Sequence, residues 1–370
     1  MNGLIYLDNC ATTKPCKEAV EGALFMMEEC FGNPSSTHQL GLLAEREVEN
    51  ARKKISDVLM VSPDEIYFNS GGTEGANTAI LGGANKKAGS RVVTTQIEHK
   101  AVLNAFKKLE SEGFEVIYLK PDEKGYIDEK TIIDAVNEKT SLVSIMHVNN
   151  EIGSMLPIDK IGKLIKLKSP RCIFHVDAVQ SFGKIPVYPA KWNIDALSVS
   201  AHKIHGIKGA GALYVKKGVN IKPIIYGGGQ ERGLRSGTLN TPAIVAFGKA
   251  CEKINFEDIN HVRLLRDTLV DYIKDLDVVF NSSVEGFPYI LNVSFKNIRS
   301  EVMLNALSAR GVYVSAASAC AGNKESHVLS ATGAKYAYSA IRISFSRDNT
   351  ADEIKEAAKI IRETVKNLTI

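Results

Sequence analysis

The chain has 370 residues, of which 44% are hydrophobic and 24% charged, and its formal net charge is +4 at pH 7. This length exceeds the usual size of one domain, so we expect a large domain with a smaller partner. The small, evenly spread charge gives no indication of a nucleic-acid partner or a membrane surface. The N-terminus MNGLIYLDN lacks the features of a signal peptide, and no apolar stretch approaches a membrane span. We therefore expect a cytoplasmic protein.

The six cysteines lie far apart, at positions 10, 16, 30, 172, 251 and 320. They form no CxxC pair and have no clustered histidines beside them, so we predict no zinc or iron–sulfur site. Their scatter through a large apolar chain argues against a disulfide framework. We interpret most of them as small hydrophobic core residues.

Helix and strand patterns alternate from about residue 44 to 215, which is typical of βαβ units and a mainly parallel sheet. One helical face begins this region and consists of Ala44, Val48, Ala51, Ile55 and Val58. The predicted strands are 66–69, 91–95, 115–119, 141–147, 172–176, 194–199 and 212–215.

Beyond about residue 250 the pattern changes to an α+β one. Helices are predicted at 261–276 and 301–310, and strands at 290–295 and 341–345. A capping box of Thr350 and Glu353 begins a last helix, whose apolar stripe is Ile354, Ala357, Ile361 and Val365. We therefore predict an α/β protein with a large domain over residues 13–250 and a small domain formed by 1–12 and 251–370. The site is expected in the cleft between them.

Lys203 lies in the stretch SVSAHKIHGIKGAG, residues 198–211, just beyond a predicted buried strand and beside Ser200 and His202. An amine becomes a usable nucleophile when its environment is rigid and partly desolvated, so Lys203 suits a Schiff base with an aldehyde cofactor. Pyridoxal phosphate is such a cofactor and needs an acidic residue at its ring nitrogen, which Asp177 can supply. The alternative for a lysine in a loop is a solvated surface charge.

Two glycine-rich loops are candidate phosphate sites. In NSGGTEGAN, residues 69–77, small residues such as Gly72 let backbone N–H groups approach an anion, Thr73 adds a hydroxyl, and a helix N-terminus follows. A plain tight turn is the alternative, and the spacing matches neither the P-loop nor GxGxxG. The second loop, residues 226–238, could reach a phosphate in its own subunit or in a neighbour.

Three more polar residues follow predicted strands. His99 lies at a predicted helix start, where an imidazole could lie over a cofactor ring and move protons; a capping or surface histidine is the alternative. Asn150 follows another strand, and ligands in open α/β sheets collect at that edge. Gln180, in HVDAVQS at 175–181, is suited to the ring hydroxyl.

Cys320 lies in a run of small and polar residues, 314–327, that should form a mobile loop. An exposed thiol on a mobile arm is a candidate nucleophile, and an inert lone cysteine is the alternative. Arg342, in a predicted strand, could bind a substrate carboxylate through two hydrogen bonds or form a structural ion pair.

In this order, the motifs resemble those of the NifS/IscS-type cysteine desulfurases, which are pyridoxal phosphate enzymes of fold type I in the class V aminotransferase group. The resemblance covers nearly the whole chain. Its motifs are YLDNCATT at 6–13, FGNPSS at 31–36, SGGTEGAN at 70–77, EHKAVL at 98–103, SIMHVNNEIG at 144–153, HVDAVQS at 175–181, SAHKIHGIKGAGALYV at 200–215, GGGQERGLRSGTLN at 227–240, SAC at 318–320 and IRISFSR at 341–347.

The resemblance implies an enzyme that converts L-cysteine to L-alanine and transfers sulfur to Cys320 as a persulfide. An acceptor protein, such as a cluster scaffold or a tRNA-thiolating enzyme, would then receive the sulfur. Lys203 corresponds to the Schiff-base lysine, and Asn33 and Arg342 to substrate-carboxylate contacts. The family is dimeric, so Thr238 would complete the phosphate site of the neighbouring subunit.

The remaining implied contacts are to the cofactor. Those to the phosphate are Gly72, Thr73, Ser200 and His202, and those around the ring are His99, Asn150, Asp177 and Gln180. Gly72 stands where relatives commonly have alanine. Three alternatives stay open at this point: a selenocysteine lyase on the same fold, a plain aminotransferase, and a nucleotide-binding α/β module without a covalent cofactor.

Overall fold

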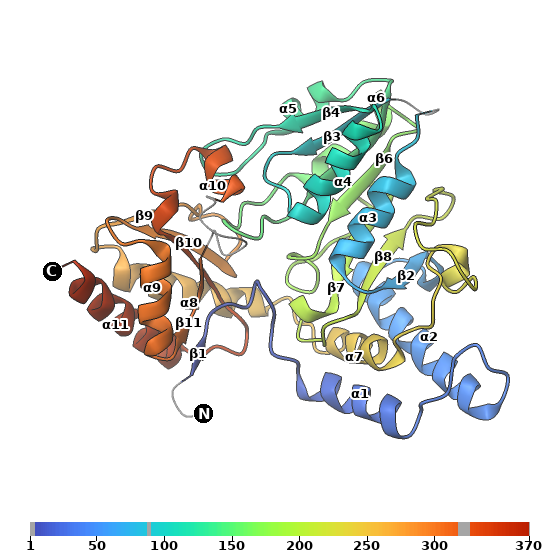
Figure 1. The fold of residues 1–370 in the computed structure, drawn as a ribbon, viewed down its shortest axis with the longest axis horizontal. Coiled ribbons are helices and arrows are strands. Elements are labelled where there is room, and N and C mark those ends of the chain that lie inside the picture. The colour runs from blue at the N-terminus through green and yellow to red at the C-terminus, as the bar shows by residue number, and fades with distance from the viewer. Residues whose placement is uncertain (1–3, 87–89, 317–325, 370) are drawn as a thin grey trace.

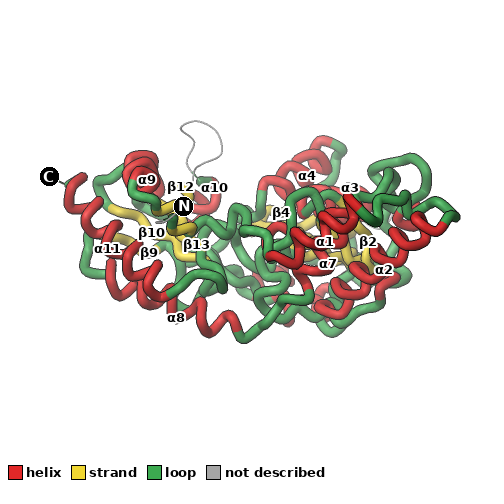
Figure 2. The backbone as a smooth tube through the Cα atoms, turned by 90° about the horizontal axis from the view of Figure 1, so that it is seen from below, coloured by secondary structure: helices red, strands yellow, loops and turns green. Residues whose placement is uncertain are grey.

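The computed structural model describes residues 4–86, 90–316 and 326–369. Cys320, the predicted nucleophile, lies outside these residues. Figure 1 shows two lobes, which we call the large lobe and the small lobe, and Figure 2 shows the same division from below. Within the described residues, no helix is both long enough and apolar enough to cross a membrane.

The large lobe is built on one mixed sheet, here called the large sheet. In its strand order β2-β8-β7-β6-β5-β3-β4, β8 alone runs antiparallel to the other strands. The strands are β2 (Ile66–Asn69), β3 (Arg91–Thr95), β4 (Glu115–Leu119), β5 (Thr140–Met146), β6 (Ile173–Asp177), β7 (Ala196–Ser200) and β8 (Gly211–Val215). The prediction of a mainly parallel sheet is therefore confirmed, and every predicted strand of this region is present.

Helices cover both faces of the large sheet. Successive residues such as Val92 and Val93, or Leu142 and Val143, are fully buried on opposite faces, because neighbouring strand side chains alternate. Helices α3 and α4 pack on one face and α2, α5, α6 and α7 on the other, while α1 packs against α7. Their bounds are α1 (Lys17–Glu28), α2 (Gln39–Leu59), α3 (Gly72–Gly83), α4 (Lys100–Ser111), α5 (Glu129–Ala135), α6 (Ile158–Lys168) and α7 (Thr241–Cys251).

The small lobe contains an antiparallel sheet of order β12-β13-β10-β9, here called the small sheet. Its strands are β9 (Val278–Phe280), β10 (Ile290–Phe295), β12 (Ser315–Ala316) and β13 (Ala340–Ser344), and β1 (Ile5–Tyr6) pairs with β11 (Val312–Tyr313) beside it. The helices are α8 (Asp258–Ile273), α9 (Ser300–Ala309), α10 (His327–Thr332) and α11 (Ala351–Leu368). The predicted capping box of Thr350 and Glu353 is present at α11, with both hydrogen bonds formed.

The N-terminal segment connects the two lobes. The Leu7 carbonyl accepts a hydrogen bond of 2.7 Å from the Ser344 amide, and the Cys10 amide donates to the Ser344 hydroxyl at 2.9 Å, so these residues belong to the small lobe. Three residues later, the Thr13 amide donates to the His202 carbonyl of the large lobe at 2.9 Å. The segment between Cys10 and Thr13 is therefore fixed at the junction of the lobes.

A buried ion pair holds the loop that precedes α7. Arg52 of α2 and Glu231 are 3% and 6% exposed, and two hydrogen bonds of 2.8 and 2.9 Å join the guanidinium to the carboxylate. The Phe68 amide of β2 donates to the same carboxylate at 2.6 Å. Because the charges and their hydrogen-bonding groups are all paired, this contact ties the 226–240 loop to α2 and β2.

We predict that Glu231→Ala lowers the free energy of unfolding by about 3–5 kcal/mol, because it leaves the Arg52 guanidinium buried without its carboxylate. Asp57→Ala is the matched control. It removes an exposed i, i+4 pair with Lys53 and should cost no more than about 0.5 kcal/mol. Urea denaturation measures both, and equal losses would contradict the prediction.

Candidate active site

The predicted site residues gather where strands of the large sheet end and helices begin. Asp177 is the last residue of β6, Ser200 is the last residue of β7, and Lys203 follows on the one-turn helix η2 (Ala201–Lys203). His99 is the N-cap of α4. This gathering follows from the parallel strands, whose carboxyl ends meet at one edge of the sheet.

The amine of Lys203 points at the N-terminal segment. It donates hydrogen bonds to the carbonyl oxygens of Cys10 and Ala11, the second at 2.8 Å. Burial lowers the Lys203 pKa to about 8, and the positive charges of Lys184 and Arg342 act in the same direction. A larger fraction of this amine is therefore neutral near pH 7 than for an ordinary lysine, which makes it a better nucleophile.

Asp177 is a buried carboxylate near this amine. It is 8% exposed, and its Oδ1 accepts a hydrogen bond from the Val179 amide at 2.9 Å. Burial raises the Asp177 pKa, while that hydrogen bond and the charges of His99 and Lys203 act against the rise. Burial also lowers the His99 pKa, although the residue lies at the surface, and its Nδ1 accepts from the Ala101 amide at 3.1 Å. The carboxylate is thus placed to pair with a cationic ligand atom.

The start of α3, which we call the anion cradle after its predicted role, lies beside Ser200. Gly71 has a φ of +150°, and a Cβ built on it would lie 3.5 Å from the Ser200 hydroxyl oxygen. A Cβ on Gly211 would lie 2.5 Å from the Gly71 Cα, so the backbones of β8 and α3 approach closely only without side chains. The N-terminus of α3, whose first-turn amides include those of Gly72 and Thr73, therefore lies beside Ser200.

The absence of a side chain at Gly72 leaves room for a neighbouring residue. A Cβ at this position would lie 2.5 Å from Cγ2 of Val179, so an alanine here would require Val179 to move. His202, at the same end of the site, has its Nδ1 3.2 Å from the Thr12 hydroxyl. Burial lowers the His202 pKa to about 4, so its ring is neutral near pH 7.

Gln180, Asn150 and Arg342 surround the same N-terminal segment. The Gln180 Nε2 donates to the Cys10 carbonyl at 3.1 Å. Arg342 donates to the Asn150 carbonyl and to the Asp8 carboxylate, both at 2.9 Å, and its Nε is buried without a partner among the described residues. Arg342 therefore forms the structural ion pair that was one of its two predicted roles. Its partner Asp8 lies in the motif YLDNCATT but was not predicted as a site residue.

Two predicted residues lie away from this group within one chain. Asn33 is exposed between α1 and α2, and its Oδ1 accepts from the Ser35 amide at 2.9 Å. Thr238 is exposed between η3 (Glu231–Gly233) and α7, and among the described residues it has no hydrogen bond. Its loop is tied to the large lobe by Glu231 and by Arg235, whose Nε lies 2.8 Å from Glu74 of α3.

The chain returns to the site directly after the residues that the structure does not describe. The Ser326 hydroxyl donates to the Glu151 carboxylate, and the His327 Nε2 donates to the Glu98 carbonyl at 2.9 Å. On the other side of residues 317–325, Ser315 of β12 pairs with Arg342 of β13. Both flanks of the Cys320 segment are therefore fixed beside predicted site residues.

Glu98 is a buried acid next to His99 that sequence reasoning missed. Its Oε1 accepts hydrogen bonds from the Thr95 hydroxyl at 2.8 Å and the Met146 amide at 2.9 Å, and its Oε2 has no partner in the described chain. Burial raises the Glu98 pKa to about 8, so the carboxyl is protonated near pH 7. The sequence pattern gave no indication that Glu98 is buried, because the burial of a single acid depends on tertiary packing.

We predict a pH-dependent contribution of Glu98 to stability. Because the folded pKa of about 8 lies above the unfolded value, the native state holds the proton more tightly. The stabilisation is full below the unfolded pKa near 4.5 and is lost as the pH rises toward about 8, by about 1.4 kcal/mol per pH unit.

Glu98→Gln stays neutral and should weaken this decline between pH 5 and pH 8, as urea denaturation at both values would measure. Glu123→Gln, at an exposed position, is the control and should keep the wild-type decline. The same decline in Glu98→Gln as in wild type would show that the carboxyl is not protonated in the fold.

Comparisons with known proteins cover both lobes. The aminotransferase class-V family matches residues 5–356. A protein named cysteine desulfurase IscS, from Methanosarcina thermophila, is 41% identical over 99% of this chain and 93% of its own length. A solved structure described as a NifS-like protein matches with a TM-score of 0.93 at 41% identity, covering 98% of this chain and 100% of its own. Another, described as SspA in complex with cysteine, has a TM-score of 0.83 at 36% identity, covering 93% and 99%.

Proposed function

The chain belongs to the class-V aminotransferase family and has the fold of type I pyridoxal phosphate enzymes, and from this membership we infer that it is a pyridoxal phosphate-dependent cysteine desulfurase. Its substrate is L-cysteine, which the related SspA structure contains. The observation that carries this inference is the partly desolvated Lys203 amine near the buried Asp177 carboxylate, with the anion cradle of α3 beside them. Selenocysteine lyase and the nucleotide-binding module are not favoured.

The residues present fit pyridoxal phosphate at three points. We propose that the phosphate is held at the start of α3 by Gly72 and Thr73, with Ser200 and His202 at its other side. Asp177 would hold the ring nitrogen protonated, because a buried carboxylate gains most from a cationic partner. Lys203 would provide the covalent attachment. When bound, the cofactor supplies the electron sink that makes the substrate α-proton acidic.

Other side chains would orient the ring and the substrate. We propose that His99 lies against the ring and that Asn150 and Gln180 face its hydroxyl group. Arg342 would bind the substrate carboxylate, which requires it to share or exchange its contacts with Asp8 and the Asn150 carbonyl. Lys203, once released from its covalent bond, would take the α-proton on Nζ and return it.

Cys320 would carry out the sulfur transfer. We propose that its thiolate attacks the sulfur of the bound cysteine, forming an S–S bond while the substrate Cβ–S bond breaks. The electron pair of that bond stays with the carbon fragment, which takes up a proton and leaves as alanine. The outer sulfur of the persulfide then passes to an acceptor protein, which leaves the Cys320 thiolate. The fixed flanks of the segment, opposite Arg342 and beside His99, support this role. An iron–sulfur cluster scaffold or a tRNA-thiolating enzyme is our proposed acceptor.

Cys320→Ser tests this assignment. We expect the holoenzyme variant to keep its cofactor absorbance and to lose release of alanine and sulfur from L-cysteine by about a thousandfold or more. Cys16→Ser is the matched control: Cys16 is the N-cap of α1, where serine is favoured, so turnover should be unchanged. Labelled sulfur should remain on wild-type Cys320, and wild-type turnover in Cys320→Ser would refute the role.

We propose that the enzyme is a homodimer in which Thr238 completes the partner's phosphate site. Thr238 is exposed on a loop that is anchored at both Glu231 and Arg235, so its position is fixed while its hydroxyl is free. An apolar stripe also faces solvent on α1, where Val20, Leu24 and Met27 are 43%, 44% and 54% exposed. The stripe fits burial against a second copy of the chain. The cytoplasmic location and the domain limits stay predictions from the sequence.

The double variant Leu24→Asp, Met27→Asp should convert the dimer to a monomer, halving the mass measured by analytical ultracentrifugation, because it would bury two charges in the interface. Val302→Asp is the control, since Val302 is an exposed residue of α9 on the small lobe. It should leave the mass unchanged. A dimer in both variants would exclude the α1 stripe from the interface.

A further inference from the structure

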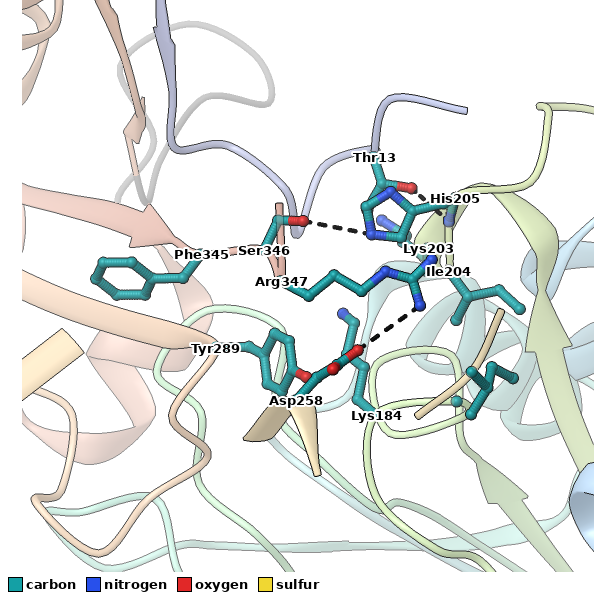
Figure 3. A pocket seen from close by; sticks show the side chains of 12 residues that line it. Thr13, Lys184, Lys203, Ile204, His205, Asp258, Tyr289, Phe345, Ser346 and Arg347 are labelled. Carbon is teal, nitrogen blue, oxygen red and sulfur yellow. Dashed lines mark hydrogen bonds and ion pairs between the residues drawn. The ribbon is translucent and has the colours of Figure 1, made fainter. Parts of the chain in front are cut away.

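Lys184 is a buried lysine that the mechanism above does not use. It is 7% exposed, and no carboxylate pairs with it among the described residues. Its amine lies over the rings of Phe287 and Tyr289, 5.9 and 5.3 Å from their centres. Figure 3 shows this amine directed into a small cavity that Lys203 also lines. Burying an ammonium group without a carboxylate lowers the stability of the fold, so the position of Lys184 calls for a physical reason.

A chain of hydrogen bonds joins Lys184 to Lys203. The Lys184 Nζ donates to Oε1 of Gln180 at 3.5 Å, and the Gln180 Nε2 donates to the Cys10 carbonyl, which also accepts from the Lys203 Nζ. A lysine ammonium has only donors, so it fixes the Gln180 amide with its oxygen toward Lys184 and its NH₂ group toward Cys10. Gln180 and Lys203 therefore share one acceptor, and Lys184 determines which way the amide faces.

The acids around the cavity are paired with other cations. Asp8 pairs with Arg342 at 2.9 Å, and Asp258 and Asp348 both pair with Arg347, at 3.7 and 3.8 Å. The charged and titratable groups that interact with the two amines or line the cavity with them are Asp8, Cys10, His99, Asp177, His202, His205, Asp258, Tyr289, Arg342 and Arg347. None of the paired acids is left to neutralise Lys184.

We propose that Lys184 is a positioning residue for Lys203: it orients the Gln180 amide beside the Cys10 carbonyl and places a second amine where it disfavours a positive charge on Lys203. This role rests on the proposed function, in which Lys203 must be neutral to form its covalent bond. Two cations near one another in a partly desolvated site destabilise each other, which activates a lysine nucleophile. Consistent with this geometry, the positive charge of Lys184 adds to burial in lowering the Lys203 pKa. Burial also lowers the Lys184 pKa, so this effect acts at pH values at which Lys184 is protonated.

The Lys203 pKa can be measured on the apoprotein. Trace acetylation at a series of pH values, with the Lys203 peptide quantified by mass spectrometry, gives the titration of this one amine. Wild type should show a pKa of about 8. Lys184→Met should raise it by about one unit, which lowers the neutral fraction near pH 7 about tenfold. Lys184→Arg keeps the charge and should stay close to wild type.

Lys191→Met, which removes an exposed lysine, is the matched control and should leave the Lys203 titration unchanged. An unchanged Lys203 pKa in folded Lys184→Met would overturn the proposal. If the methionine variant does not fold, Lys184→Gln removes the charge while keeping a polar group, and the same criterion applies. The readout needs no cofactor, so failure of the proposed function, seen as no cofactor attachment in wild type, is distinguishable from failure of this inference.

Discussion

The hydrogen bonds from the Lys203 amine to the Cys10 and Ala11 carbonyls depend on both lobes at once. Lys203 follows β7 of the large sheet, whereas Cys10 is held by Ser344 of the small sheet. The amine is therefore directed only when the N-terminal segment has crossed from one lobe to the other. Gln180 uses the same Cys10 carbonyl, and Arg342 holds Asp8 two residues earlier. A displacement of this segment would change the surroundings of the nucleophile, the ring contacts and the substrate-binding arginine together.

The charges in the site depend on burial and on which cation each acid pairs with. Glu98 is buried and holds its proton, while Asp8 is committed to Arg342. Asp177 is left as the buried carboxylate whose interactions with His99 and Lys203 oppose its protonation. One acid near the lysine is thus available to a cationic ring nitrogen, and the amine itself carries a reduced pKa. An aldehyde cofactor with a pyridine nitrogen needs an acid at that nitrogen and a neutral amine at the aldehyde. Asp177 can meet the first requirement and Lys203 the second, so the site is suited to such a cofactor.

Sequence reasoning reached the large sheet and most of the site for identifiable reasons. The strands of the large sheet are apolar on both faces, so their positions were predicted within two residues at either end, and residues such as Asp177 and Ser200 followed from strand ends. Lys184 and Glu98 were missed because their burial without an opposite charge among the described residues arises only from packing. Helices α1 and α7 were not predicted, and α7 is buried along most of its length rather than amphipathic. Asn33 and Thr238 were predicted from the resemblance alone, and within one chain both are exposed and remote from Lys203.

The central claim is that one particular amine binds the cofactor, although two lysines, the half-buried Lys203 and the buried Lys184, line the same cavity. Borohydride reduction of the pyridoxal phosphate-loaded protein, followed by peptide mapping, identifies the attached lysine directly. The account predicts a reduced cofactor adduct on Lys203 in every labelled chain. An adduct on Lys184, or a protein that stays colourless and unlabelled after reconstitution, would contradict it.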